Sequence, residues 1–277
     1  MSCLPIPPDP IRLSIVIAAY NAQATLQRAI ASCLTQRVDE PFEVLVVDDG
    51  STDSTAAVAR SFGPEVQVLS SDGNRGRSAA RNAAIEAARG SVIVPLDADD
   101  RMLSGRLAAH VAALDGNPSA VAVFGRSIGV HPGGTRPWPL MPGTPQGVDE
   151  AFARGRMAVN HPACAFRRSW WEALGGYDEQ VRVAEDFDLF LRGWTPGAYL
   201  PHDDVVLEYT IGGRFPSWQY WWANERHRRA IVARAGVPEQ PFVDHLHRAS
   251  RPAVHGLEAL RWSASSVRDR MARRNGR

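Results

Sequence analysis

The sequence predicts an α/β fold in which a mostly parallel, doubly wound sheet is followed by a helical C-terminal extension. Five short apolar runs alternate with amphipathic segments between residues 11 and 124. The runs are continuous in their apolar character, as in strands that are buried on both faces, and right-handed crossovers between such strands give a doubly wound sheet. The composition also changes after residue 214, where arginine and tryptophan become frequent.

The individual elements follow from local patterns. The expected strands are rich in branched apolar residues and span 13–18, 43–47, 66–69, 91–96 and 120–124. The expected helices have apolar residues at helical spacing and span 22–36, 54–61, 77–89 and 103–114. Residues 129–148 are rich in proline and glycine and are expected to form a loop. Ligands of such a sheet bind beyond the carboxyl ends of its strands, so polar residues there are candidates for the site.

The composition is that of a globular protein with almost no net charge. The chain has 277 residues, 44% of them hydrophobic, with 31 basic against 30 acidic side chains, which argues against a nucleic-acid partner. All 31 basic residues are arginine, so a Walker-type lysine, a Schiff-base lysine and pyridoxal phosphate chemistry are excluded. Cys3, Cys33 and Cys164 lie far apart, which predicts neither a disulfide framework nor structural zinc.

Charge divides the chain into two predicted regions, residues 1–214 and 215–277. The second holds 12 arginines against 5 acidic residues and is expected to be a basic, aromatic-containing helical extension. Neither a signal peptide nor a membrane span is expected, which predicts a cytoplasmic chain. Residues 256–277 have the pattern of an interfacial helix. This leaves two alternatives open: peripheral contact with the inner membrane face, or a helical cap on the core.

The first acidic cluster, Asp48 and Asp49 before Gly50, closes the second expected strand. Carboxylates in this position can accept hydrogen bonds from a ribose or a base. The alternative is a capped turn, in which Gly50 has a positive φ and Ser51 or Asp53 caps the next helix.

The second cluster, Asp97, Asp99 and Asp100, follows the fourth expected strand. Side chains two residues apart in an extended segment point the same way, so Asp97 and Asp99 would face one pocket. Mg²⁺ and Mn²⁺ take one or two carboxylates and complete their shell with water and phosphate oxygens. Solvated acids in a loop are the alternative.

The third cluster, Glu185 and Asp186, begins a segment in which Phe187, Phe190 and Leu191 recur at helical spacing. Acids in the first turn are favoured by the helix dipole whether or not they take part in chemistry. In the functional interpretation, one of them is a general base that accepts the proton of an acceptor hydroxyl.

Together these clusters resemble family 2 glycosyltransferases over residues 11–210. The motifs that carry the resemblance are 14–21 (SIVIAAYN), 46–53 (VVDDGSTD), 74–76 (NRG) with 79–82 (AARN), 96–100 (LDADD), 175–179 (GGYDE) and 185–186 (ED). The resemblance implies a GT-A fold, a nucleoside-diphosphate sugar donor with a UDP-sugar favoured, a divalent cation (Mn²⁺ or Mg²⁺), and inversion at the anomeric carbon.

The resemblance also implies roles for individual residues. The donor site is expected to comprise Ala18, Tyr20, Asp49, Arg81 and Asp97. Ala18 and Tyr20 would line the nucleotide pocket and Asp49 would contact the base, although many members have threonine or proline where this chain has Ala18. Asp99 is expected to bind the metal directly, and Asp97 is expected to lie near both the metal and the ribose.

On the reaction side, the resemblance makes Asp186 the catalytic base, with Glu185 beside it. Three acceptor candidates come from the residues themselves. His161 precedes an expected strand and would face the cleft, although a structural histidine is the alternative. Trp221 and Trp222 lie in an aromatic-then-basic stretch, and aromatic rings stack on sugar faces.

The predicted function is the transfer of a sugar to an acceptor hydroxyl in glycan or glycoconjugate biosynthesis, with a sugar, lipid-linked or peptide acceptor. One alternative is a sugar-phosphate nucleotidyltransferase, but residues 18–21 lack the glycine-rich basic loop of those enzymes. Another is a non-catalytic nucleotide-sugar-binding module, against which the presence of Asp97, Asp99 and Asp186 argues. A processive synthase is disfavoured because the Gln-x-x-Arg-Trp signature is missing from the sequence.

Overall fold

The computed structural model describes residues 11–131, 134–137, 142–211 and 218–237, with the side chains of α8 described from residue 224 on. The strands belong to one mixed sheet of order β3-β2-β1-β4-β8-β6-β9-β5, with β7 paired to β6. They are β1 (Leu13–Ala19), β2 (Phe42–Asp48), β3 (Gln67–Ser70), β4 (Val92–Asp97), β5 (Arg101–Met102), β6 (Ala122–His131), β7 (Gly134–Pro137), β8 (Cys164–Arg167) and β9 (Tyr199–Thr210).

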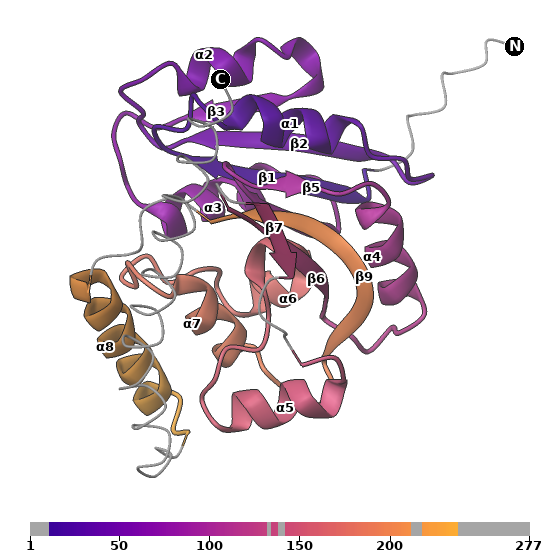
Figure 1. Cartoon of the computed structure of the whole chain (residues 1–277), viewed down its shortest axis with the longest axis vertical. Coiled ribbons are helices and arrows are strands. Elements are labelled where there is room, and N and C mark those ends of the chain that lie inside the picture. Colours follow the sequence, from indigo (N-terminus) through magenta and orange to yellow (C-terminus); the bar gives the residue numbers. More distant parts are fainter. Residues whose placement is uncertain (1–10, 132–133, 138–141, 212–217, 238–277) are drawn as a thin grey trace, which may run out of the picture.

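Helices cover both faces of the sheet (Figure 1). They are α1 (Leu26–Leu34), α2 (Thr55–Arg60), α3 (Arg77–Ala87), α4 (Arg106–Asp115), α5 (Pro145–Ala153), α6 (Arg168–Ala173), α7 (Glu185–Arg192) and α8 (Trp218–Arg234), with 3₁₀ turns η1 (Gly63–Glu65) and η2 (His161–Ala163). Along β1, Ile15 and Ile17 belong to the hydrophobic cluster that includes residues of α1 and α4, whereas Val16 belongs to the cluster that includes residues of α3 and α7. Apolar side chains thus leave both faces of the strand, which explains the continuous apolar run.

The first half of the sheet is the predicted parallel one. β3, β2, β1 and β4 pair in parallel, and the register places Ala18 opposite Asp97 and Ala19 opposite Asp48. The carboxyl ends of β1, β2 and β4 therefore meet at one edge of the sheet. Two of the three acidic clusters lie at this edge.

The second half differs from the sequence prediction. β8 is inserted antiparallel between β4 and β6, because the chain returns to the centre of the sheet after β7 and α5. The prediction of a loop over 129–148 is wrong at both ends. β6 continues to His131 and pairs with β7, and α5 begins at Pro145. The side chain of Thr144 caps α5 by accepting a hydrogen bond from Gly147 N (3.2 Å), and proline is well tolerated in a first helical turn. The glycine and proline content concealed this helix.

The long strand β9 connects the two halves of the molecule (Figure 1). It runs parallel to β6 and then antiparallel to β5, with irregular register near Arg126. Its last residue, Thr210, donates its backbone N–H to Oδ1 of Asp100 (2.7 Å). The end of β9 therefore lies against the turn that carries the second acidic cluster.

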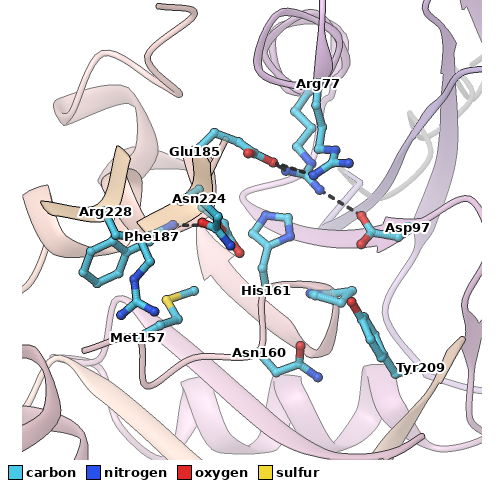
Figure 2. Close-up of a pocket in the computed structure, with 14 residues that line it drawn as sticks. Arg77, Asp97, Met157, Asn160, His161, Glu185, Phe187, Tyr209, Asn224 and Arg228 are labelled. Atoms are coloured by element: carbon cyan, nitrogen blue, oxygen red, sulfur yellow. Dashed lines mark hydrogen bonds and ion pairs between the residues drawn. The ribbon is translucent and has the colours of Figure 1, made fainter. Parts of the chain in front are cut away.

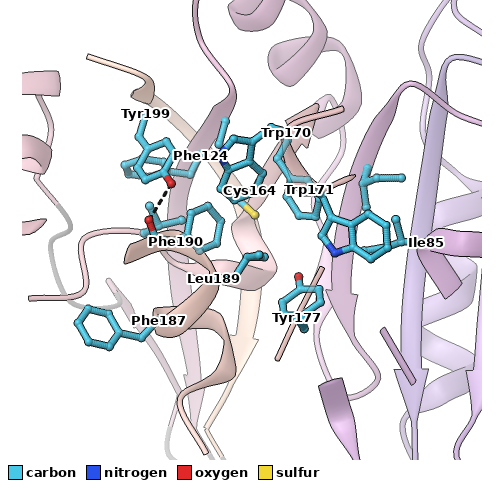
Figure 3. Close-up of a cluster of buried hydrophobic side chains, with 14 of the residues drawn as sticks. Ile85, Phe124, Cys164, Trp170, Trp171, Tyr177, Phe187, Leu189, Phe190 and Tyr199 are labelled. Atoms are coloured by element: carbon cyan, nitrogen blue, oxygen red, sulfur yellow. Dashed lines mark hydrogen bonds between the residues drawn. The ribbon is translucent and has the colours of Figure 1, made fainter. Parts of the chain in front are cut away.

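An aromatic cluster fixes the position of α7 (Figure 3). Ring centroids are 5.4 Å apart in the pairs Phe166–Trp170, Trp170–Phe190 and Phe190–Tyr199. The Tyr199 hydroxyl donates a hydrogen bond to the carbonyl oxygen of Phe190 (2.7 Å). These rings come from β8, α6, α7 and β9, so the helix that begins at Glu185 is held by packing across four elements.

The predicted C-terminal region is described only in its first part. α8 is helical as expected, and Ile231 is buried in the same hydrophobic cluster as Phe187. Within the described ranges, no helix combines the length and the apolar character needed to cross a bilayer. The interfacial helix predicted at 256–277 lies outside the described residues.

Candidate functional site

A buried arginine joins two of the acidic clusters. Arg81, in the second turn of α3, donates from Nη1 to Oε1 of Glu185 (2.6 Å) and from Nη2 to Oδ1 of Asp97 (2.8 Å). Burial alone would lower the pKa of Arg81, but the carboxylates of Asp97 and Glu185 raise it above its usual value. Arg81 therefore stays charged and ties the end of β4 to the start of α7.

These residues line a cavity of about 290 Å³. Five residues predicted from the sequence lie in its wall: Arg81, Asp97, His161, Glu185 and Asp186. The other lining residues are Arg77, Met157, Asn160, Pro162, Ala184, Phe187, Tyr209, Asn224 and Arg228. Carboxylates from β4 and α7, far apart in the sequence, thus reach one cavity.

Asp186 is the second residue of α7 and lies two positions after a strained residue. Ala184 has left-handed backbone angles (φ 62°, ψ 35°), which cost a non-glycine residue about 1 kcal/mol. Burial raises the pKa of Asp186 to about 6, and the charge of Glu185 acts in the same direction. A carboxylate with this pKa is well matched to accept a proton near neutral pH.

Glu185 is held more firmly than Asp186. Its side chain is buried, and Oε1 accepts from Arg81 and also from Nη1 of Arg77 (3.3 Å). Its Oε2 is buried without a hydrogen-bond partner among the described residues. Two arginines engage one Glu185 oxygen, whereas Asp186 accepts only the backbone N–H of Phe187 (2.8 Å) among the hydrogen bonds of the described residues. Asp186 is therefore the better candidate for the base.

The turn after β4 is anchored from outside the cavity. Nη2 of Arg28 donates to the carbonyl oxygen of Asp99 (2.8 Å) and to Oγ1 of Thr210 (2.9 Å), and the Thr210 hydroxyl also donates to that carbonyl. The Asp99 side chain lies at the surface of the turn, outside the cavity lining. Partial burial and the neighbouring charge of Asp97 raise the pKa of Asp99.

The structure does not place Asp97 and Asp99 in one pocket as expected, because Asp97 lines the cavity and Asp99 lies outside its lining, but both carboxylates have the chemistry to bind a divalent cation that is shared with a phosphate ligand. No group of three or more histidine, cysteine, aspartate or glutamate side chains in the described ranges could hold a metal ion by itself. Mg²⁺ and Mn²⁺ require only one or two carboxylates when diphosphate oxygens complete the shell. Burial and, after it, repulsion from Asp97 raise the pKa of Asp99, and such a cation would relieve the repulsion.

The anchoring of the turn yields a first prediction. Thr210→Val removes the hydroxyl that donates to the Asp99 carbonyl, while the backbone N–H that holds Asp100 is kept. We expect the Mn²⁺-dependent affinity for UDP to fall about tenfold, the equivalent of one lost hydrogen bond of about 1.4 kcal/mol. Calorimetric titration measures this affinity. Thr210→Ser, which keeps the hydroxyl, should bind like wild type, and equal affinities in all three proteins would contradict a role for this contact.

Asp49 has a role that the sequence did not indicate. It is buried, and its two oxygens accept the backbone N–H groups of Arg75 and Gly76, each at 2.9 Å. The side chain therefore fixes the loop that leads into α3. Gly50 has a φ of +71°, as the turn interpretation expects, and a Cβ there would lie 2.4 Å from the backbone of Gly73. The contact between Asp49 and a base remains a prediction.

The loops after β1 and β2 are cross-linked beside this edge of the sheet. The Asn21 side chain accepts the backbone N–H of Thr52 (2.9 Å), and the Asn21 backbone N–H donates to Oγ of Ser51 (2.9 Å). Ala18 lies next to Asp97 in the sheet register, and Tyr20 is 48% exposed. The expected nucleotide-contacting residues thus lie at the carboxyl ends of the strands, where a ligand can reach them.

The structure describes the positions of the three acceptor candidates to different extents. His161 lines the cavity, and burial lowers its pKa well below the usual value, so its ring is neutral. Trp221 and Trp222 lie on α8, but their side chains are outside the described part of the structure. The same helix brings Asn224 and Arg228 into the cavity wall instead. Arg228 belongs to the basic run that the sequence shows, whereas Asn224 carries no signal in the sequence.

The comparisons with known proteins identify the family. The profile of the family described as "Glycosyl transferase family 2" matches residues 14–175. The chain belongs to glycosyl transferase family 2. It is 35% identical over 214 residues to the succinoglycan biosynthesis protein ExoU of Rhizobium meliloti, covering 68% of this chain and 58% of that protein. It is 29% identical over 191 residues to the hyaluronan synthase of Pasteurella multocida, covering 65% of this chain but 18% of that protein.

Solved structures confirm the GT-A fold that the sequence predicted. TarS 1–349 of S. aureus, in complex with UDP-GlcNAc, has a TM-score of 0.64 at 20% identity and covers 82% of this chain and 68% of that one. The mannosyltransferase PcManGT of Pyrobaculum calidifontis, in complex with GDP-Man and Mn²⁺, has a TM-score of 0.61 at 21% identity and covers 88% and 68%. Family and fold together favour the predicted glycosyltransferase over a nucleotidyltransferase.

Proposed function

We propose that this family 2 glycosyltransferase moves a sugar from a nucleoside-diphosphate donor to an acceptor hydroxyl with inversion at the anomeric carbon. The observation that carries this is the convergence of Asp97 and Asp186 on one cavity, with Arg81 between their elements. One carboxylate lies at the strand edge where nucleotides bind, and the other has the pKa of a general base.

The donor would lie along the strand ends. We propose that Ala18 and Tyr20 contact the nucleoside, with Asp49 holding the neighbouring loop, and that Asp97 and Asp99 bind Mn²⁺ or Mg²⁺ together with the diphosphate. When bound, such a cation neutralises the charge of the leaving diphosphate. A UDP-sugar is favoured by the family resemblance, and the neighbours of this fold bind UDP-GlcNAc in TarS and GDP-Man in PcManGT.

The reaction itself would be carried by α7. Asp186 accepts the proton of the acceptor hydroxyl as the hydroxyl oxygen attacks the anomeric carbon from the face opposite the diphosphate, so the configuration inverts. Through its two hydrogen bonds, Arg81 holds Glu185 and Asp97 in place during this step. The proposed place of the reaction is the cytoplasm, with a sugar, lipid-linked or peptide acceptor, and peripheral membrane contact through residues 256–277 is part of this hypothesis.

A product assay tests the proposal. The protein is incubated with Mn²⁺ and a panel of UDP-, GDP- and dTDP-sugars, and the released nucleotide is identified by chromatography. We expect at least one donor to release a nucleoside diphosphate, because both hydrolysis of the donor and transfer of its sugar leave that group behind. Formation of a nucleoside triphosphate and a sugar 1-phosphate when pyrophosphate is added would indicate a nucleotidyltransferase, and donor binding without turnover would indicate a binding module. Either result would contradict the proposal.

A pH dependence follows from the position of Asp186. Burial and Glu185 raise its pKa to about 6, and only the deprotonated carboxylate can accept a proton. We expect the transfer rate at saturating donor to rise with pH, to be half-maximal at about 6 and to level off about one pH unit above that. Initial rates between about pH 5 and about pH 8 measure this profile. A rate that stays level below pH 6 would contradict the assignment of the base.

A further inference from the structure

Three polar atoms in the cavity wall are buried without a hydrogen-bond partner among the described residues. They are Nδ1 of His161, Oε2 of Glu185 and Oδ1 of Asn224. Most buried polar atoms in proteins are hydrogen-bonded, so three unpartnered atoms around one cavity indicate a ligand that supplies the partners. The three residues belong to η2, α7 and α8, and no single element accounts for them.

The cavity has two ends. Figure 2 shows Asp97 on one side and Asn224, Phe187 and Arg228 on the other, with the His161 ring between them. The Asp97 end lies at the strand edge where the donor diphosphate is proposed to bind. The opposite end, formed by α7 and α8, is therefore available for the acceptor.

His161 is fixed so that one nitrogen serves the cavity. Its Nε2 lies 2.7 Å from the hydroxyl oxygen of Tyr177, and this contact orients the ring. Tyr177 is itself buried, with the Arg81 guanidinium 5.7 Å from its ring centroid. The remaining nitrogen, Nδ1, is free to exchange a hydrogen bond with a hydroxyl group, which can act as donor or acceptor.

Asn224 is fixed by the docking of α8. One turn further along this helix, the guanidinium of Arg228 lies 4.9 Å from the centroid of the Phe187 ring, and Ile231 is buried in the core cluster. These contacts hold α8 against α7, which begins with Glu185 and Asp186. The amide of Asn224 thus has a defined position opposite His161.

We propose that His161 Nδ1 and Asn224 bind two hydroxyl groups of the acceptor that flank the attacking hydroxyl, so the acceptor is a saccharide. A sugar ring supplies several hydroxyls together with an apolar face, which the side chains of Met157 and Phe187 can contact. The isolated hydroxyl of a serine side chain or of a fatty alcohol would leave both groups unpartnered. This inference rests on the proposed function and names the acceptor class of the same site.

The test uses simple probes as acceptors. Donor turnover with Mn²⁺ is measured alone, with methyl α- and β-hexopyranosides, and with a serine-containing peptide or octan-1-ol. We expect at least one methyl glycoside to stimulate nucleotide release above donor hydrolysis, and the isolated alcohols to give no stimulation. Stimulation by the peptide or octan-1-ol equal to that by the glycosides would overturn the inference.

Variants assign the two groups. Asn224→Ala is expected to raise the KM for the stimulating glycoside about tenfold and to change the KM for the donor much less. Asn117→Ala, the same change at an exposed position after α4, is the control. His161→Asn keeps a polar atom near Nδ1, whereas His161→Gln keeps one near Nε2, so the first should retain acceptor affinity better than the second.

The outcomes separate this inference from the proposed function. An unchanged KM for the acceptor in Asn224→Ala and His161→Gln would overturn the inference. A loss of donor affinity as large as the loss of acceptor affinity in both variants would also overturn it. Each variant is checked by thermal unfolding to show that it is folded. Wild type that releases no nucleotide from any donor contradicts the proposed function, whereas release that no glycoside stimulates contradicts the acceptor inference alone.

Discussion

Asp186→Asn is expected to lower the rate of sugar transfer about 10³-fold, within the range for loss of a general base, and to leave donor affinity unchanged. The amide has nearly the same shape as the carboxylate but cannot accept the proton of the acceptor hydroxyl. Donor affinity should survive because the proposed diphosphate contacts are made by Asp97 and Asp99, on a different element. The variant thus separates binding from chemistry.

Two measurements on this variant are needed together. Initial rates give the loss of turnover, and calorimetry with UDP and Mn²⁺ gives the affinity. Asp203→Asn is the matched control, because Asp203 is a surface residue whose side chain is 83% exposed. A parallel loss of affinity and rate in Asp186→Asn would show that this residue binds the donor and is not the base.

Arg81→Met is expected to have the largest effect on stability, a loss of about 3 kcal/mol in the free energy of unfolding. Removing one partner of a buried ion pair leaves the other charge desolvated, which typically costs about 3–5 kcal/mol. The lower end of this range applies because one partner, the Asp97 side chain, is 35% exposed and stays partly hydrated, although the Glu185 side chain is only 2% exposed. Methionine keeps much of the apolar stem, so the loss reports mainly on the charge.

Urea unfolding measures this effect. Arg126→Met serves as the control, because Arg126 pairs with Asp203 at the surface and such pairs contribute about 0–1 kcal/mol. Equal stability losses in the two variants would contradict the view that Arg81 neutralises buried carboxylates. The same Arg81 variant should also lose transfer activity, since the relative positions of β4 and α7 depend on this side chain.

The placement of the first two acidic clusters at one edge of the sheet could be predicted because parallel strands end at a common edge. The apolar runs 13–18 and 91–96 predict two strands of a parallel sheet, and in the structure these strands are neighbours in which Ala18 is paired with Asp97. The spacing of apolar residues after Asp186 likewise predicted α7. In both cases a local periodicity determines where a polar side chain must lie.

Other features depend on contacts between distant segments, which local patterns do not encode. The sequence could not show that Asp49 turns toward the backbone of residues 75 and 76, because a strand-end carboxylate serves a ligand or a loop equally well. Nor could it show that Asn224 reaches the cavity, because that depends on how α8 packs against α7. The insertion of β8 depends in the same way on long-range pairing.

The central claim is that carboxylates from β4 and α7 surround one nucleotide sugar, with Asp97 and Asp99 binding its diphosphate through a divalent cation. The most direct measurement is the calorimetric affinity of Asp99→Ala for UDP with and without Mn²⁺. Wild type should bind UDP more tightly when Mn²⁺ is present, and in Asp99→Ala this difference should disappear. An Asp99→Ala protein that keeps the full Mn²⁺-dependent gain in affinity would contradict the account.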